Sequence, residues 1–455
     1  MSIERLTIFH INDLHSQFSN WPHIVGYVRA HRHKASLFVD IGDHADRSHL
    51  ITEATEGRGN VELLNEAEID YATIGNNEGV TFSKQQLEQL YAHAQFPVLL
   101  ANLFEPNGQL PSWARKYEIH TFQNGVKVGL IGWTAPFKGL YEQLGWKCES
   151  SFQLLKDIVQ EVREQVDIVV LLSHVGFFQD EEIAKEMPDI DIILGSHTHH
   201  LIERGKKINQ TMITQAGKHG HYFGRLDIKF DTQRKICVDM KETLISANAC
   251  QPAQSTLNLI KKIEHQSFEK LNYKVATVPF DLAVSWQENT EITQLLCDGL
   301  AEWCKESIAM MNAGVILESI PQGQITRGDI HRICPHPINP CIVELTGEEL
   351  LATIQKAYTE EMRFLKLKGF GFRGKLLGKM IFTGIEIQSN SDMEVLEVRV
   401  EGQLLEGKRT YRIATLDMYT FGYLFPEIYK APHKEYLMPE FLRDILAWKL
   451  GQEWA

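Results

Sequence analysis

The chain has 455 residues, of which 44% are hydrophobic and 23% charged, an ordinary globular composition in a chain too long for one core. Its net charge of −13 disfavours a nucleic-acid polymer or an anionic membrane as partner, because both are negatively charged. The N-terminus lacks a basic segment followed by an apolar one, and no apolar run is long enough to span a membrane, so we expect a cytoplasmic protein.

Short aliphatic strands alternate with polar clusters and helical segments over the first 230 residues or so. Residues 151–165 predict one of the helices, with Ser150 or Ser151 as its N-cap. Strands so rich in Val, Ile and Leu indicate a sheet buried on both faces between helical layers. The predicted strands are residues 6–11, 36–41, 71–75, 96–102, 126–132, 167–173 and 190–195.

The pattern changes after about residue 231, where a polar stretch precedes an amphipathic segment. We therefore predict a first domain over residues 1–245, a linking helix within 246–275 and a second α/β domain over 276–455. The second domain mixes a predicted helix with predicted strands. These segments are residues 290–306, 341–346 and 409–416.

Seven oxygen or nitrogen donors follow the predicted strands. An isolated His or Asp after a strand is most often a turn former, but burying seven such groups together without a cation would be costly. In an open α/β sheet, ligands bind outside the carboxyl ends of the strands, so these donors can converge on one spot. The donors are Asp13, His15, Asp43, Asn76, His174, His197 and His199.

This donor set is too large for one tetrahedral ion and suits two ions that share a carboxylate. Two ions about 3.5–4 Å apart can hold a hydroxide and clamp the attacking and leaving oxygens of a phosphoryl displacement. Imidazole and carboxylate donors fit Mn, Zn, Fe or Co without choosing among them. The pattern therefore predicts a dinuclear hydrolase.

The motifs "DLH" (13–15), "GD" (42–43), "GNNE" (75–78), "SHVG" (173–176) and "GSHTH" (195–199) together resemble the calcineurin-like metallophosphoesterases. The later segments "NAG" (312–314), "ITRGDI" (325–330) and "ELTGEEL" (344–350) resemble the C-terminal domain of 5'-nucleotidases. "GNNEG" and "PHPINP" are similar to the Bacillus-type YunD branch of that family. The resemblance implies a four-layered α/β/β/α catalytic domain, a linking helix and a smaller substrate-binding α/β domain, with the active site between them.

The resemblance also implies a role for each donor. By position, one ion is held by Asp13, His15, Asp43 and His199. The other is held by Asp43, Asn76, His174 and His197. Asp43 is then the bridge between the ions, and the substrate is a small phosphate ester, with nucleotides as the best guess.

The chain departs from the family pattern beside this set. Relatives have a histidine after the metal-binding asparagine, often oriented by an Asp, where this chain has Asn77 and Val80. An asparagine can donate a hydrogen bond to a phosphoryl oxygen, but it cannot deliver a proton, which is typically worth 10²–10⁴-fold in rate.

Three hypotheses follow from Asn77. The substrate can have a better leaving group, such as a phosphoanhydride or a cyclic phosphodiester. Another group can supply the proton, with His44, His200 and His219 as candidates. Alternatively, the protein is a sensor that binds metal and nucleotide with little or no turnover.

The second domain also departs from the pattern. Leu317 replaces the family's arginine, and "CPHPIN" replaces an aromatic motif, which makes His336 and Asn339 candidate base contacts. Residues 363–379 carry six basic residues, and we weigh a solvated hairpin against a loop that brings Arg373 to an anionic group. The remaining candidate substrate contacts are Asn312, Gly314, Asp417 and Phe421, with Tyr419 and Tyr423 as further aromatic candidates.

We therefore expect a metal-dependent phosphoric ester hydrolase that resembles 5'-nucleotidases and acts on nucleotides as a phosphatase, or on cyclic nucleotides or nucleotide sugars as a phosphodiesterase. Its predicted catalytic residues are Asn77 and Asp43. The oligomeric state is left open.

Overall fold

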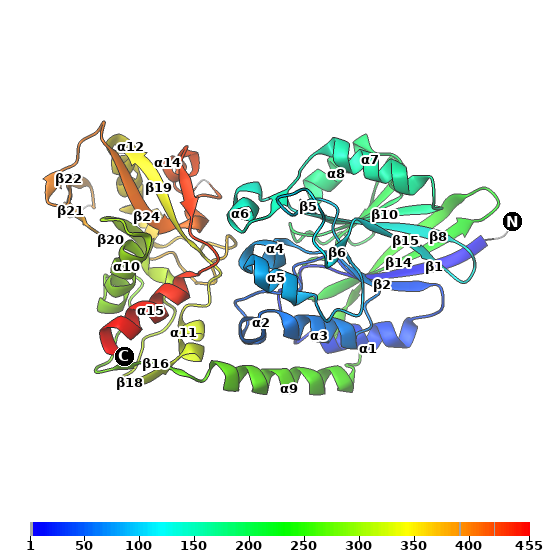
Figure 1. Ribbon diagram of the computed structural model, residues 1–455, viewed down its shortest axis with the longest axis horizontal. Helices are drawn as coiled ribbons and strands as arrows, with labels where there is room; N and C mark the ends of the chain where they lie inside the picture. The colour runs from blue at the N-terminus through cyan, green and yellow to red at the C-terminus, as the bar shows by residue number, and fades with distance from the viewer. Residues whose placement is uncertain (1–2, 391–392, 423) are drawn as a thin grey trace. The chain divides into compact units, whose positions relative to one another are not determined.

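The computed structural model describes residues 3–390, 393–422 and 424–455 (Figure 1). The chain forms two compact units, residues 1–267 and 268–455. The helix α9 (Gln254–Leu271) leads from the first unit into the second and lies inside the stretch predicted to link the domains. Among the described residues, no helix has the length and apolar character that crossing a membrane requires.

The first unit is built on two sheets. In sheet order, one contains β15 (Ile236–Ser246), β14 (Tyr222–Asp231), β1 (Ile3–Ile11), β2 (Ser36–Asp40), β3 (Tyr71–Ala72), β4 (Val98–Leu99) and β6 (Ala114–Arg115). The other contains β12 (Lys206–Ile208), β13 (Thr211–Thr214), β11 (Ile192–Gly195), β10 (Ile168–His174), β8 (Lys127–Thr134) and β7 (Tyr117–Thr121). A short pair, β5 (Leu103–Phe104) and β9 (Lys147–Cys148), lies apart from both.

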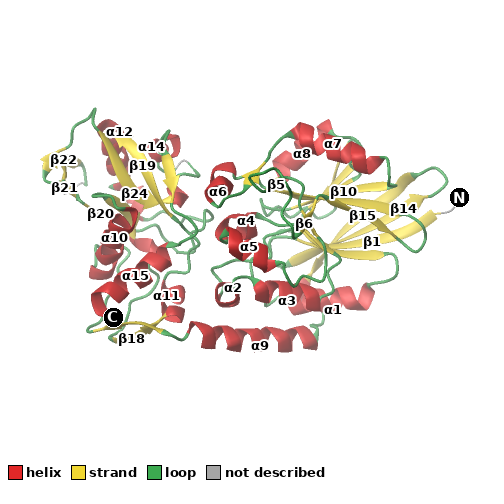
Figure 2. Ribbon diagram, viewed as in Figure 1, coloured by secondary structure: helices red, strands yellow, loops and turns green. Residues whose placement is uncertain are grey.

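Helices cover the outer faces of both sheets, as Figure 2 shows. The helices α7 (Phe152–Arg163) and α8 (Phe177–Glu186) lie over one sheet, and α1 (Trp21–His31) and α3 (Arg58–Glu66) lie under the other. The remaining helices of this unit are α2 (Leu50–Thr55), α4 (Asn76–Thr81), α5 (Lys84–Leu90) and α6 (Lys138–Gln143). The predicted four-layered α/β/β/α arrangement is therefore confirmed.

The alternation of side chains along β10 shows why both faces of its sheet are apolar. Val170 and Leu172 pack in the core between the sheets, whereas Val169 and Leu171 pack in the core under α7 and α8. Successive side chains of a strand point to opposite faces, so a central strand needs a continuous apolar run. Each such side chain stabilises the fold by about 1.5–3 kcal/mol on burial.

The parallel strands place their carboxyl ends at one edge of each sheet. β1, β2 and β3 run parallel, as do β8, β10 and β11. The predicted strand at 71–75 is shorter than expected, because only Tyr71 and Ala72 pair with β2 before the chain turns into α4 at Gly75.

The second unit also packs helices against a sheet. Its five-stranded sheet contains β20 (Met380–Thr383), β17 (Ala309–Asn312), β24 (Thr410–Leu416), β19 (Pro340–Thr346) and β25 (Lys434–Tyr436). Smaller sheets pair β16 (Lys274–Val278) with β18 (Gly323–Thr326), and β22 (Val395–Val400) with β21 (Ile385–Ser389) and β23 (Gln403–Leu404). Its helices are α10 (Glu291–Cys304), α11 (Arg327–Ile333), α12 (Gly347–Ala357), α13 (Glu360–Arg363), α14 (Pro426–Lys430) and α15 (Leu442–Trp454).

One continuous core joins these elements. Leu296 and Leu300 of α10, Leu350 of α12 and Ile445 of α15 pack with strands of the five-stranded sheet. The predicted helix at 290–306 and strands at 341–346 and 409–416 correspond to α10, β19 and β24.

Candidate metal centre

Five of the seven predicted ligands have a left-handed backbone, which costs a non-glycine residue of order 1–3 kcal/mol and is concentrated at functional sites. Hydrogen bonds between loops hold this conformation: the amide of Asp13 donates to the carbonyl of Gly42, and that of His15 to the carbonyl of Asp43. The loops after β1 and β2 are thereby fixed to each other. The φ angles are +50° at Asp13, +48° at His15, +51° at Asp43, +71° at His197 and +59° at His199.

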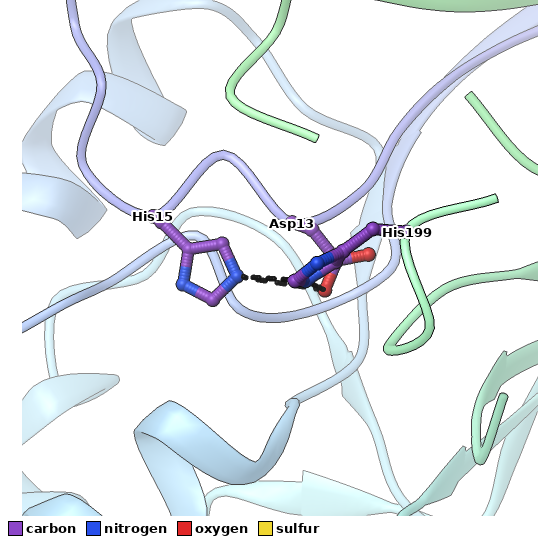
Figure 3. A group of neighbouring side chains, drawn as sticks. All are labelled: Asp13, His15 and His199. Carbon is purple, nitrogen blue, oxygen red and sulfur yellow. Dashed lines mark hydrogen bonds and ion pairs between the residues drawn. The ribbon is translucent and has the colours of Figure 1, made fainter. Parts of the chain in front are cut away.

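Asp13, His15 and His199 form one ligand group (Figure 3). The Nε2 atoms of His15 and His199 lie 3.2 Å apart, and Oδ1 of Asp13 lies 3.3 Å from Nε2 of His199. Oδ1 of Asp13 is also 3.7 Å from Nε2 of His15. Two imidazole nitrogens and a carboxylate oxygen thus face one small volume, as the ligands of one cation do.

Asp13, Asp43 and His174 form a second group that shares Asp13 with the first. Nε2 of His174 lies 3.4 Å from Oδ2 of Asp43 and 3.9 Å from Oδ1 of Asp13. The same Oδ2 of Asp43 lies 3.7 Å from Nε2 of His15. Both carboxylates therefore lie between the two imidazoles, and the choice of Asp43 as the bridge stays a prediction from the resemblance.

Asn76 and His197 complete the set. Nδ1 of His197 lies 2.8 Å from Oδ1 of Asn76, and its backbone amide donates to Oδ2 of Asp13 at 3.0 Å. The rings of His174 and His197 are 5.4 Å apart. The structure therefore brings all seven predicted ligands together, from the ends of five strands.

The donor chemistry fits divalent cations. Nδ1 of His174 donates to the carbonyl of Ile41 at 2.7 Å, which leaves the lone pair on Nε2. This Nε2 is buried, has no hydrogen-bond partner among the described residues and faces two carboxylates. A buried acceptor beside buried anions is orphaned unless a cation or a proton lies between them.

The same electrostatics appear in the pKa values. Burial alone would lower the pKa of His174, but the nearby negative charges of Asp43 and Asp13 raise it to about 10. Burial alone would raise the pKa of Asp43, yet the charge of His174 holds it well below its usual range. A site that holds a proton so firmly attracts a metal cation for the same reason, and the two compete.

Glu78 is a functional residue that the sequence prediction missed. Its Oε2 accepts the backbone N–H groups of Asp43 at 2.9 Å and Gly75 at 2.8 Å, and its Oε1 accepts that of Ala45 at 2.7 Å. Burial and the charge of Asp43 raise its pKa to about 7. Glu78 holds the loops after β2 and β3 together. In the sequence, its place in the motif "GNNE" was the feature that could have indicated this role.

Asn12 is a second missed residue. Its Nδ2 donates to Oδ2 of Asp13 at 2.8 Å and to the carbonyl of Gly217 at 2.7 Å, and its Oδ1 accepts the amide of Ala216 at 3.0 Å. Asn12 therefore orients a ligand and fixes the loop after β13. Its only signal in the sequence was its place before Asp13.

Asn77 contacts the predicted bridge directly. Its backbone amide donates to Oδ1 of Asp43 at 2.7 Å, and its side-chain Nδ2 donates to Oδ2 at 2.7 Å. The side-chain amide of Asn77 therefore donates to a carboxylate that is a predicted metal ligand. From the sequence, we expected this amide to donate to a phosphoryl oxygen of the substrate.

The three candidate replacements for the missing acid lie in different settings. His44 is buried against Trp21 and Phe18, and burial lowers its pKa to about 3, so it cannot deliver a proton. His200 packs against Phe177 and lies 2.8 Å from the Thr198 hydroxyl. His219 is half-buried, and its ring lies 5.8 Å from that of His15; burial and the charge of His15 lower its pKa to about 4.

Two predicted substrate contacts are internal cross-links of the second unit. Asn312 is fully buried, donates to the carbonyl of Leu377 at 2.7 Å and accepts from the Tyr419 hydroxyl at 2.8 Å. His336 is fully buried and stacked on Phe372, with Nε2 donating to the carbonyl of Val315 and Nδ1 accepting the amide of Arg373. This corrects the sequence assignment, since Phe372 covers the imidazole that was expected to meet a base.

Gly314, Asn339 and Asp417 are also buried. A methyl group on Gly314 would lie 2.0 Å from the carbonyl oxygen of Leu376, so glycine is needed there for close packing. The side chain of Asn339 donates to the carbonyl of Glu440, and its own carbonyl accepts the amide of Asp417.

Arg373 and Phe421 keep partial exposure. Arg373 donates to the carbonyl of Phe372 at 3.3 Å, and Phe421 stacks on Tyr436 at 6.1 Å between ring centres. Tyr419 is wholly buried, and Tyr423 lies outside the described residues. Of the substrate contacts predicted in this unit, Phe421 and Arg373 retain surface for a ligand.

Comparison with known proteins decides the family. The profile of calcineurin-like phosphoesterases matches residues 6–201, and that of the 5'-nucleotidase C-terminal domain matches residues 272–423. The metallophosphoesterase YunD of Bacillus subtilis is 45% identical over 460 residues, covering 99% of this chain and 100% of YunD. The chain belongs to the calcineurin-like phosphoesterase family.

More distant relatives of this phosphoesterase share its length and fold. The protein UshA of Yersinia enterocolitica is 24% identical over 492 residues, covering 92% of this chain and 85% of UshA. A putative 5'-nucleotidase structure from Staphylococcus aureus superposes with a TM-score of 0.71 at 19% identity, covering 98% and 96% of the two chains. That likeness shows the fold alone.

The phosphoesterase is a phosphoric ester hydrolase that uses two divalent metal ions, as members of its family do. Its ligand groups, Asp13–His15–His199 and Asp13–Asp43–His174, are the residues that the structure offers to these ions.

Proposed function

We propose that the phosphoesterase hydrolyses phosphate esters or anhydrides of nucleotides. The observation that carries this is the convergence of five His and Asp donors in two adjoining ligand groups, with Asn76 and His197 beside them, in a family of phosphoester hydrolases. Nucleotides are favoured by the C-terminal domain and by relatives at 22–25% identity named as a trifunctional nucleotide phosphoesterase, of which this chain spans 31%, a snake venom 5'-nucleotidase and an apyrase.

The ligand set defines the mechanism. In the assignment implied by the resemblance, one ion would be held by Asp13, His15, Asp43 and His199, and the other by Asp43, Asn76, His174 and His197. When bound, the ions lower the pKa of water and neutralise charge on the phosphoryl oxygens. Glu78 positions Asp43 by accepting its backbone amide, and Asn12 orients Asp13 by donating to its carboxylate.

Asn77 restricts the leaving group. Its amide holds Asp43 and carries no proton that it can release at neutral pH, so an alkoxide would depart without acid assistance from this position. We therefore place the best substrates among phosphoanhydrides and cyclic phosphodiesters, whose leaving groups need less help.

The test is release of phosphate by the full-length chain with Mn²⁺, from nucleoside monophosphates, nucleoside diphosphates, sugar nucleotides and cyclic nucleotides, the last followed by an added phosphatase. Asp43→Asn is the blank, because it removes the carboxylate that the resemblance assigns to both ions, and we expect it to lose nearly all hydrolysis. Wild-type turnover in Asp43→Asn would contradict the two-ion mechanism. No turnover of any substrate by a chain that binds two metals would favour a nucleotide-binding sensor.

The cytoplasmic location expected from the sequence stays a prediction, which fractionation of the native host would test.

A further inference from the structure

The imidazole of His15 is held from both sides. Its Nε2 faces Asp13, Asp43 and His199, as described above, and on the opposite side Oδ2 of Asp46 lies 3.4 Å from Nδ1. The side chains of His15 and Asp46 are 11% and 3% exposed. A carboxylate behind a metal-binding imidazole fixes its tautomer and makes the opposite nitrogen a stronger ligand.

Asp46 is itself fixed in place. Its backbone amide donates to the Ser16 hydroxyl at 2.9 Å, and its Oδ1 accepts the amide of Ser48 at 2.8 Å. The Ser16 hydroxyl also accepts from Nδ2 of Asn60 at 3.0 Å, which ties the loop to α3. Asp46 is thus a built contact and not a freely rotating surface carboxylate.

At His174, the corresponding imidazole of the second group, the two groups that contact Nδ1 are neutral. Its Nδ1 lies 2.7 Å from the carbonyl of Ile41 and 2.6 Å from the Ser196 hydroxyl. Asp13 and Asp43 each have a carboxylate oxygen within 3.9 Å of Nε2 of both His15 and His174. Glu78 accepts the backbone amide of Asp43, so none of these three carboxylates acts on one imidazole alone. Behind the two imidazoles, the groups therefore differ by the negative charge of Asp46, which lies next to His15.

We infer that the two ions bind with unequal affinity, and that Asp46, as a positioning residue for His15, makes the Asp13–His15–His199 group the tighter one. This inference deepens the two-ion centre on which the proposed function rests. The first ion then stays bound at low metal concentration. The second, held at the His174 group, loads as the concentration rises, and hydrolysis follows its binding.

The test is calorimetric titration of the full-length, chelator-treated chain with Mn²⁺ alone. Wild type is expected to show two steps separated by at least tenfold in affinity. Asp46→Asn keeps the shape of the side chain but removes its charge, and we expect it to weaken the tighter step by about 10- to 100-fold. The weaker step should stay within about threefold of wild type.

Ser196→Ala is the matched control, because it removes the hydroxyl behind His174 and none of the contacts of Asp46. It should weaken only the second step. Thermal unfolding without metal checks that both variants fold. If Asp46→Asn does not fold, Ser16→Ala, which removes the hydroxyl that accepts the Asp46 amide, should weaken the same tighter step by a smaller factor.

The inference is overturned if wild type shows two equal sites, if Asp46→Asn leaves both steps unchanged or if it weakens both equally. Hydrolysis is measured separately with wild type at saturating Mn²⁺. A chain that binds metal in two unequal steps but hydrolyses nothing would reject the proposed function and leave this inference standing.

Discussion

At the residue scale, Asn77 stands where the family resemblance places a histidine. Both its backbone and its side-chain amide donate to Asp43. The residue therefore contributes order to the centre, since a hydrogen bond to a charged group is worth about 1.5–3 kcal/mol. The Asn77 side chain cannot act as a general acid.

Asn77→His tests this division of roles. A histidine can protonate a leaving oxygen, so we expect kcat for a nucleoside monophosphate to rise by about 10²-fold, the low end of the 10²–10⁴-fold that acid assistance typically supplies. The rate for 4-nitrophenyl phosphate, whose leaving group needs no proton, should change far less.

Asn77→Ala is the control, because it removes the side-chain bond to Asp43 without adding an acid. It should lower activity on both substrates. Equal changes on the two substrates in Asn77→His would show that proton delivery does not limit this enzyme.

Asp417 predicts a pH dependence of stability. Burial raises its pKa to about 8, against the effect of backbone hydrogen bonds from Asn339 and Met418, and its Oδ1 has no partner among the described residues. The folded state therefore holds a proton that the unfolded state has released between about pH 4 and pH 8. Over that range, this group makes the free energy of unfolding fall as the pH rises.

Asp417→Asn removes the titration, so the variant should gain stability relative to wild type at pH 8 by on the order of a few kcal/mol and gain much less at pH 4. Urea unfolding of both proteins at several pH values measures this difference. A constant difference at every pH would show that Asp417 does not titrate in this range.

At the scale of elements, the centre depends on how closely the loops approach one another. Gly75 ends the segment after β3, and a methyl group there would lie 2.0 Å from Oδ1 of Asp43 and 2.5 Å from Cε1 of His174. Its backbone is extended, with φ of −95°, so close packing and not conformational freedom requires glycine.

Gly75→Ala should therefore force Asp43 and His174 apart. Overpacking of this kind typically costs about 1–3 kcal/mol, which corresponds to a loss of roughly 10- to 100-fold in metal affinity. Calorimetric titration with Mn²⁺ measures the loss. Gly139→Ala is the control, because no atom lies within 4 Å of a methyl group at Gly139.

The elements of the first unit could be predicted because its strands are continuous apolar runs and each donor directly follows a strand. The loops that make the centre work could not. Glu78 reaches three backbone amides in two loops, and no local pattern shows where those amides lie. The prediction that His336 contacts a base has the same weakness. A polar residue in a loop is expected to be exposed, and the sequence does not show that Phe372 packs on its ring.

At the scale of the whole molecule, every predicted ligand belongs to the first compact unit, residues 1–267. A ligand that binds only the folded state stabilises it by about 2.7 kcal/mol at 100 times its dissociation constant. Metal binding should therefore stabilise the first unit and leave the second, residues 268–455, unchanged.

Differential scanning calorimetry with and without Mn²⁺ tests this expectation. We expect the transition of the first unit to rise by roughly 5–10 °C, while a separate transition of the second unit stays in place. Asp43→Asn should abolish the rise. An equal rise of both transitions would show that metal binding is coupled to the folding of both units.

The layered α/β fold, the order of the two domains and a set of seven candidate donors could be predicted from the sequence. Apolar periodicity and the position of polar residues after strands are local properties, so they can be recognised in the sequence alone. The three-dimensional structure was needed to show that Asn77 donates to Asp43 and that Glu78 ties two loops together. It was also needed to show that Asp46 lies behind His15 and that Asn312 and His336 are buried. These facts depend on distances between segments remote in sequence, which packing sets and local pattern does not record.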